Sequence, residues 1–108
     1  MSRIQLAPEF GDDIERILDR LANYQLEDAP GRIQEILEAI SVLEHNPLIG
    51  RPVEDEAREA GTRELVIGRR MRGYVALYRY VPELDIVFVL ALRSQREAGY
   101  AREIRDET

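Results

Sequence analysis

Residues 86–100 comprise the sequence Ile86-Val87-Phe88-Val89-Leu90-Ala91-Leu92-Arg93-Ser94-Gln95-Arg96-Glu97-Ala98-Gly99-Tyr100. The first seven residues are apolar and include β-branched side chains, which is typical of a central strand buried on at least one face. The spacing Ser94-x-x-Glu97 matches a capping box and predicts that a short final helix begins near Gln95. Two arginines and a tyrosine therefore lie where a rigid strand passes into a helix. Groups held on such a support are well placed to act on a partner.

The sequence predicts three consecutive strands, over 63–67, 74–81 and 86–92, joined by connections of hairpin length. Strands connected in this way form an antiparallel meander. Residues 3–7 alternate between polar and apolar side chains, which predicts a short N-terminal strand. Residues 46–61 contain two prolines and two glycines and are expected to form a loop.

Two amphipathic helices are expected before the meander. Pro8 suits the first turn of a helix, and apolar residues recur at helical spacing over 8–25. A second apolar stripe runs from Ile33 to Leu43 and ends at Asn46-Pro47. The two helices form a hairpin that must bury its stripes on one face of the sheet. The sequence therefore predicts one α+β domain over 1–108, in the order β-α-α-β-β-β-α with a mostly antiparallel sheet, whose residues 101–108 fray.

Composition narrows the class of protein. Hydrophobic residues make up 44% of the chain and charged residues 33%, which is typical of a soluble globular protein. We expect no membrane span and no signal peptide, because apolar runs are short and the N-terminus has no long apolar core. The chain has no cysteine and one histidine, which argues against disulfides and a structural zinc site. The expected location is the cytoplasm, and no cofactor or metal is implied.

Charge is unevenly distributed along the chain, whose net charge is −6. Residues 1–61 contain 14 acidic residues against six arginines, whereas residues 62–108 contain nine arginines against seven acidic residues. All 15 basic residues are arginine, which binds phosphate or carboxylate in a bidentate manner and cannot act as a neutral base. An anionic partner is therefore expected to meet the C-terminal half.

Four segments together resemble the RelE/ParE superfamily of toxins from type II toxin–antitoxin modules. They are Asn46-Pro47-x-x-Gly50-Arg51-Pro52-Val53, Gly61-Thr62-Arg63-Glu64-Leu65-Val66-Ile67-Gly68, Tyr74-Val75-Ala76-Leu77-Tyr78-Arg79-Tyr80 and Val87-x-Val89-Leu90-Ala91-Leu92-Arg93-x-Gln95-Arg96-Glu97. The resemblance extends from Pro8 to about Tyr100. It implies a growth-arresting toxin that is neutralised by a small antitoxin wrapped around it.

The resemblance implies two different targets within this superfamily. RelE-like members cut mRNA in the ribosomal A site, whereas ParE-like members inhibit DNA gyrase without known nuclease chemistry. Residues 50–65 resemble ParE-like members, and the chain lacks the lysines that RelE-like nucleases often carry. Residues 93–100 are instead similar to the RelE-like arrangement of an arginine at the last strand's exit and a tyrosine on the final helix. We favour gyrase inhibition, with ribosome-dependent mRNA cleavage as the alternative and a non-toxic domain of the same fold as a third option.

The RelE-like alternative assigns catalytic roles to five residues. Arginines would stabilise the phosphate, and a tyrosine would stack on a base or pass a proton, although an ordinary tyrosine pKa of about 10 makes it a weak base. These residues are Arg63, Arg79, Arg93, Arg96 and Tyr100. A purely structural interpretation pairs Arg96 with Tyr100 along the helix and Arg93 with Glu97. His45, beside Pro47, is interpreted as a helix C-cap.

A second set of residues is a candidate surface for the antitoxin. Arginines cluster at one hairpin tip, and three tyrosines share one face of the following strand because their numbers are even. These residues are Arg69, Arg70, Arg72, Tyr74, Tyr78 and Tyr80. An acidic, amphipathic antitoxin segment could fold onto them and form a toxin–antitoxin hetero-oligomer. The alternatives are a solvated turn for the arginines and core packing for the tyrosines.

Overall fold

The computed structural model describes residues 1–23, 29–55, 58–68, 73–95, 97, 99 and 100. Arg69, Arg70, Arg72, Arg96 and the segment 101–108 lie outside this part of the chain. The elements, in chain order, are β1 (Arg3–Leu6), α1 (Pro8–Asn23), α2 (Ala29–Ser41), the 3₁₀ turn η1 (Val42–Glu44), β2 (Arg51–Pro52), β3 (Thr62–Ile67), β4 (Tyr74–Val81) and β5 (Ile86–Ser94).

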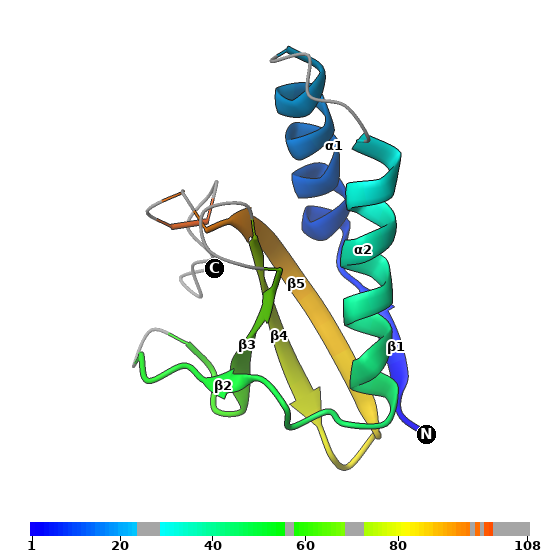
Figure 1. Cartoon of the computed structure of the whole chain (residues 1–108). Helices are drawn as coiled ribbons and strands as arrows, with labels where there is room; N and C mark the ends of the chain where they lie inside the picture. The colour runs from blue at the N-terminus through cyan, green and yellow to red at the C-terminus, as the bar shows by residue number, and fades with distance from the viewer. Residues whose placement is uncertain (24–28, 56–57, 69–72, 96, 98, 101–108) are drawn as a thin grey trace.

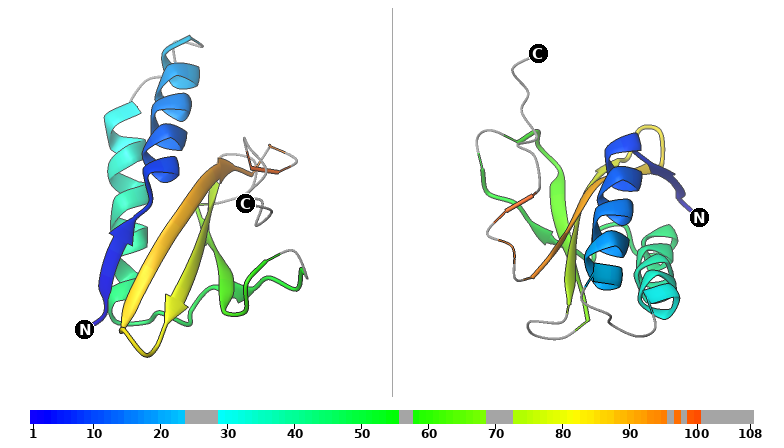
Figure 2. Two further views of the ribbon diagram at one scale, coloured as in Figure 1. Left: turned by 180° about the vertical axis from the view of Figure 1, so that it is seen from behind. Right: turned by 90° about the horizontal axis from the view of Figure 1, so that it is seen from above.

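The described strands form one sheet in the order β1-β5-β4-β3-β2, in which β1 runs parallel to β5 and the other neighbours are antiparallel. Figures 1 and 2 show α1 and α2 side by side on one face of this sheet. The connection between β2 and β3 and the described residues after β5 lie on the other face. The α+β architecture and the antiparallel meander are therefore confirmed.

The helices follow the predicted stripes. Pro8 and Glu9 lie in the first turn of α1. The missing N–H of Pro8 is tolerated there, and the negative charge of Glu9 is favourable at a helix N-terminus. Phe10, Ile17 and Leu21 of α1 are buried, as are Ile36 and Ile40 of α2. They pack against β4 and β5 in one apolar cluster. No helix in the described part of the chain combines the length and apolar character needed to cross a membrane.

A β-bulge interrupts the pairing of β4 with β5. The register passes from Tyr78↔Val89 to Leu77↔Ala91, so Leu90 is an extra residue on β5. Val87 and Val89 before the bulge and Leu92 after it all belong to the cluster under the helices. Strict alternation would have placed Arg93 on the same face as Val87 and Val89. Because of the bulge, Arg93 instead lies opposite Val75, on the face away from the helices.

Asp13 secures the strand just beyond the bulge. The pairing of β1 with β5 ends at Leu6↔Val89, so no strand of the described residues flanks β5 on that side at Leu92. The Leu92 N–H donates a 2.9 Å hydrogen bond to Asp13 Oδ2 of α1. The Asp13 side chain is only 1% exposed and has Arg16 one turn away at 3.9 Å. A buried carboxylate therefore replaces the missing neighbour strand.

Gly50 and Tyr78 join the loop after η1 to the core. The Gly50 N–H donates to the hydroxyl of Tyr78 at 2.8 Å. A Cβ atom on Gly50 would lie 2.6 Å from the Tyr78 ring and 2.7 Å from the Glu64 carbonyl oxygen. Only glycine allows the loop to approach this closely, which gives Gly50 a packing role in the segment Gly50-Arg51-Pro52.

Two sequence predictions about secondary structure are wrong. Residues 46–61 contain a short strand, β2, whose Arg51 and Pro52 pair with Glu64 and Arg63 of β3. The final helix expected near Gln95 does not form in the described residues, which adopt a turn and bends.

The capping box after β5 forms only in part. The Ser94 N–H donates to Glu97 Oε2 at 2.8 Å, whereas the buried Ser94 hydroxyl has no hydrogen-bond partner in the described structure. The Gln95 N–H bonds to the Gly73 carbonyl and so extends the pairing with the neighbouring hairpin. The Arg93 guanidinium donates hydrogen bonds to the carbonyls of Ser94 and Glu97. A helix would need these carbonyls as acceptors for its own backbone N–H groups.

Replacing Gly50 is expected to weaken the fold. Gly50→Ala should lower the free energy of unfolding by about 1–3 kcal/mol, because the new Cβ meets backbone and ring atoms. Gly11 of α1 is the matched control, since nothing lies within 4 Å of its Cβ position. Gly11→Ala should raise the free energy of unfolding by roughly 0.5–1 kcal/mol. Equal effects of the two changes in urea unfolding would contradict the close-packing argument.

Removing the Asp13 carboxylate tests whether its hydrogen bond to the Leu92 N–H stabilises the fold. Asp13→Ala should lower the free energy of unfolding by about 1–3 kcal/mol, because the Leu92 N–H is left buried without a partner. Asp12→Ala, at the exposed neighbouring position of α1, should change it by no more than about 0.5 kcal/mol. Thermal and urea unfolding of both variants measure this difference. A loss at Asp12 as large as that at Asp13 would show that helix charge, and not the buried hydrogen bond, is responsible.

Candidate functional site

The candidate site lies on the sheet face away from the helices. Neighbouring residues of a strand point to opposite faces, and Leu65 and Ile67 pack with the helix-side cluster. Glu64 and its partner Leu77 therefore lie on the other face. Val75, Leu77 and Ala91 on this face are at most 2% exposed. The apolar residues of this face are therefore shielded from solvent, and polar side chains surround Glu64 beside them.

The Glu64 carboxylate is the centre of the cluster. Its Oε2 accepts a 2.6 Å hydrogen bond from the Tyr100 hydroxyl and lies 4.0 Å from Arg93 Nη2. Its Oε1 accepts from Nε and Nη2 of Arg51 at 3.4 and 3.3 Å. The side chains of Glu64 and Arg93 are 17% and 16% exposed, whereas Arg51 is 59% exposed. Because Glu64 and Arg93 are largely out of water, their attraction is weakly screened.

The Tyr100 ring lies between two guanidinium groups. The guanidinium carbon of Arg58 is 5.6 Å from the ring centroid and that of Arg93 is 5.4 Å away. Both distances allow a cation–π attraction. Arg93 also donates to the backbone carbonyls of Ser94 and Glu97 at 3.2 Å. Arg93 and Tyr100 are therefore held together from several directions.

The environment of Tyr100 opposes its ionisation. Burial raises the pKa of its phenol well above the ordinary value, and the hydrogen bond to Glu64 with the charge of that carboxylate raises it further. The positive charge of Arg93 opposes this shift only in part. At neutral pH, Tyr100 is therefore a hydrogen-bond donor and cannot accept a proton as a base.

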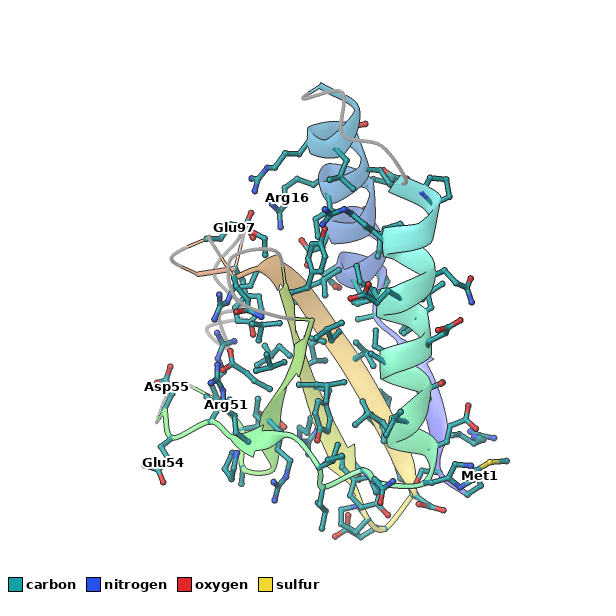
Figure 3. All side chains as sticks on the ribbon, in the orientation of Figure 1. Met1, Arg16, Arg51, Glu54, Asp55 and Glu97 are labelled. Atoms are coloured by element: carbon teal, nitrogen blue, oxygen red, sulfur yellow. The ribbon has the colours of Figure 1, made fainter. Side chains whose placement is uncertain are left out.

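Glu97 attaches the segment after β5 to helix α1. Its carboxylate forms an ion pair with Arg16 and another with Arg20, at 3.1 Å in the case of Arg20. Figure 3 shows Arg16 extending from α1 toward Glu97. The third donor to this carboxylate is the Ser94 N–H described above. These contacts fix the polypeptide three residues before Tyr100.

Two of the arginines that were expected to act with Arg93 have other partners. Arg63 lies on the opposite face of β3 from Glu64 and donates to the carbonyls of Leu48 and Gly50 at 3.1 and 2.7 Å. Arg79 forms a 3.1 Å ion pair with Glu59. Arg63 therefore holds a loop on the other face of β3 from Glu64, and the catalytic roles of Arg63 and Arg79 stay predictions.

The tyrosine row does not form an open platform. Tyr74 and Tyr78 are buried in the cluster under the helices, and burial raises the pKa of Tyr78. Tyr80 is half-buried and donates to Asp85 at 2.8 Å, a contact that raises the pKa of Tyr80. Hydrogen bonds from Ser2 and Tyr80 lower the pKa of Asp85. The packing interpretation is thus correct for Tyr74 and Tyr78.

Sequence reasoning missed Arg51, Arg58 and Glu64 as members of the cluster. Arg51 and Arg58 lie in the segment expected to be a featureless loop, and Glu64 lies in a strand without any motif of its own. Only the pairing of β2 with β3 and the path of the chain after β5 bring these residues together. His45 follows η1 as its C-cap residue, as predicted, and its backbone N–H bonds to the Val42 carbonyl.

Residues 4–99 match the family described as the ParE toxin of the type II toxin–antitoxin system, parDE. No curated protein sequence matches the chain. One similar solved structure is the chromosomal ParDE toxin–antitoxin system from P. aeruginosa, at 20% identity and a TM-score of 0.67, covering 87% of this chain and 96% of that chain.

Two further structures share the fold. The RelBE2 toxin–antitoxin complex from Mycobacterium tuberculosis has 23% identity and a TM-score of 0.55, covering 89% of this chain and 93% of that chain. The intact E. coli RelBE toxin–antitoxin complex has 13% identity and a TM-score of 0.51, covering 90% of this chain and 100% of that chain. At these identities the structures establish a common fold.

The contact between Tyr100 and Glu64 is expected to make stability depend on pH at the alkaline end. Because the pKa of Tyr100 is higher in the folded chain than the value of about 10 in the unfolded chain, the contact stabilises the fold fully below about pH 10. Above that pH only the unfolded chain readily ionises, so the contribution decreases as pH rises further. The difference in free energy of unfolding between the wild type and Tyr100→Phe should follow this course.

At neutral pH this difference should be about 1.5 kcal/mol or more, as for a hydrogen bond to a charged group. Urea unfolding at a series of pH values from neutral to strongly alkaline measures it. A difference that grows as the pH rises above 10 would contradict the assigned contact, because it would require Tyr100 to ionise more readily in the folded chain.

Proposed function

This chain belongs to the ParE family of toxins from type II toxin–antitoxin systems, and we propose that it arrests growth by binding DNA gyrase without breaking a covalent bond. Gyrase inhibition is the activity that the resemblance to ParE-like members implies. The alternative is ribosome-dependent cleavage of mRNA, which the resemblance of residues 93–100 to RelE-like members implies. The two activities make different demands on Arg93 and Tyr100.

The observation that carries the proposal is the occupation of Arg93 and Tyr100 by Glu64. A ribonuclease must stabilise negative charge on the phosphate, deprotonate the 2′-hydroxyl and protonate the leaving oxygen. Arg93 faces the Glu64 carboxylate at 4.0 Å, and the Tyr100 hydroxyl donates to that carboxylate at 2.6 Å. A carboxylate already lies where a phosphate would be needed, and two like charges there repel each other.

Tyr100 and His45 are also poorly suited to the proton transfers that RNA cleavage requires. The raised pKa of Tyr100 keeps its phenol protonated at neutral pH. The single histidine of the sequence, His45, is an exposed cap residue beside η1. The net charge of −6 opposes the approach of RNA, whose binding depends on phosphate contacts. These features support a role in protein binding.

One observation favours the alternative. Arg93 and Tyr100 do lie together, with the guanidinium 5.4 Å from the ring centroid. A large partner such as the ribosome could orient the RNA and supply the missing groups. The alternative would then require Glu64 to move away from both residues.

We further infer that a cognate antitoxin neutralises the protein by binding it directly in a hetero-oligomer. The solved structures of similar fold include toxin–antitoxin complexes, and the family itself is defined by such modules. The expected partner is an acidic, amphipathic segment that folds on binding. The proposed location is the cytoplasm, where gyrase and the ribosome are found.

Two reactions run in parallel test the target. Purified protein should inhibit supercoiling by gyrase and should leave labelled mRNA intact on translating ribosomes. Tyr100→Phe should retain most of the gyrase inhibition, because the proposed activity uses no proton transfer. Adding the product of the neighbouring open reading frame should restore supercoiling.

Cleavage of mRNA, lost in both Tyr100→Phe and Arg93→Gln, would overturn the proposed target in favour of the alternative. Absence of activity in both reactions would favour the non-toxic domain. Failure of the neighbouring gene product to restore supercoiling would count against that product as the antitoxin.

A further inference from the structure

The groups around Glu64 form a set that could hold an oxyanion other than a carboxylate. Arg51 approaches one carboxylate oxygen through two nitrogen atoms, at 3.4 and 3.3 Å, and Tyr100 donates to the other at 2.6 Å. Arg93 lies 4.0 Å from that second oxygen. Guanidinium groups and hydroxyls bind phosphate with the same geometry as they bind carboxylate. The ligand chemistry of the site is therefore that of an oxyanion.

The cluster around Glu64 contains more positive charge than one carboxylate can balance. Arg51 and Arg93 face Glu64, and Arg58 lies over the other partner of Glu64, the Tyr100 ring. Nη1 of Arg58 is buried and has no hydrogen-bond partner in the described structure. A buried guanidinium N–H without an acceptor is unfavourable.

We propose that Glu64 is a built-in counter-anion, which occupies an oxyanion site formed by Arg51, Arg93 and Tyr100 and keeps phosphate groups out of it. Glu64 is carried by strand β3, which is paired on both sides, so its carboxylate is held against these donors. An intramolecular group of this kind has a high effective concentration, which free phosphate at ordinary levels does not match. Glu64 would thereby determine specificity against phosphate-bearing ligands.

The inference rests on the same contacts of Glu64 as the proposed function, but it does not depend on gyrase being the target. It concerns which anions the site admits, whereas the target concerns which macromolecule the toxin inhibits. A binding measurement on the purified protein therefore tests it independently of either activity assay.

The test compares the wild type with Glu64→Thr, which removes the charge, vacates the space and keeps a good strand former. Inorganic phosphate is the probe, and amide chemical shifts from nuclear magnetic resonance report binding. Glu64→Thr should bind phosphate about tenfold more tightly than the wild type or better, because a like charge at contact distance is gone. The largest shifts should occur at Arg93 and Tyr100. Adding Arg93→Gln to Glu64→Thr should abolish the gain.

Glu59→Thr is the matched control. Glu59 also forms an ion pair with an arginine, Arg79, at 3.1 Å, but its side chain is 60% exposed. The control should bind phosphate no more tightly than the wild type. If Glu64→Thr does not fold, Glu64→Gln keeps the side-chain volume and should show the same order of affinities.

Two results would overturn the proposal. One is a folded Glu64 variant whose phosphate affinity equals that of the wild type, and the other is an equal gain in Glu59→Thr. A fluorescent single-stranded RNA then identifies the source of the anion. A gain for RNA as well as phosphate supports a site open to a nucleic-acid backbone, and a gain for phosphate alone supports a site for small anions.

Discussion

The β-bulge at Leu90 is the constraint on which the candidate site depends. By adding one residue to β5, it keeps Val87, Val89 and Leu92 in the core and turns Arg93 to the face away from the helices. The buried hydrogen bond from the Leu92 N–H to Asp13 closes the strand where β1 no longer flanks it. Without this change of phase, Arg93 would point at the apolar helices and could not meet Tyr100 or Glu64.

Glu64 links three parts of the chain that are distant in sequence. Through Arg51 it holds β2, through Arg93 it faces the end of β5, and through Tyr100 it holds the segment after β5. Glu97 fixes the same segment to α1 from the other side. The polar groups of Glu64, Arg93 and Tyr100 are thus bound to one another, with Glu64 and Arg93 largely buried and Arg51 at the exposed edge. Such a network supports a toxin that acts by binding, and it accounts for the proposed exclusion of phosphate.

Much of the fold was predictable because the spacing of apolar residues along the chain indicates which side of each helix or strand is buried. The strand over 74–81 was predicted with its observed bounds, and both helices begin or end within a few residues of the predicted positions. The two-residue strand β2 was missed because so short a segment has no period. The final helix is absent from the described residues because the Arg93 guanidinium donates to the Ser94 and Glu97 carbonyls, which a helix would need for its own hydrogen bonds. The site was predicted in part, since Arg93 and Tyr100 do meet, although Arg51, Arg58 and Glu64 were not foreseen.

The amino-acid sequence by itself determined the α+β class, the helix hairpin, the meander and the superfamily, because each of these follows from local residue patterns. Tertiary structure alone decided which face carries Arg93, that Tyr74 and Tyr78 are core residues, and that Glu64 pairs with Arg51, Arg93 and Tyr100. The physical reason is that a bulge is defined by how two strands pair. The alternation of polar and apolar residues along one strand does not show where a bulge will form. Likewise, the partner of a charged side chain is set by how distant segments pack together.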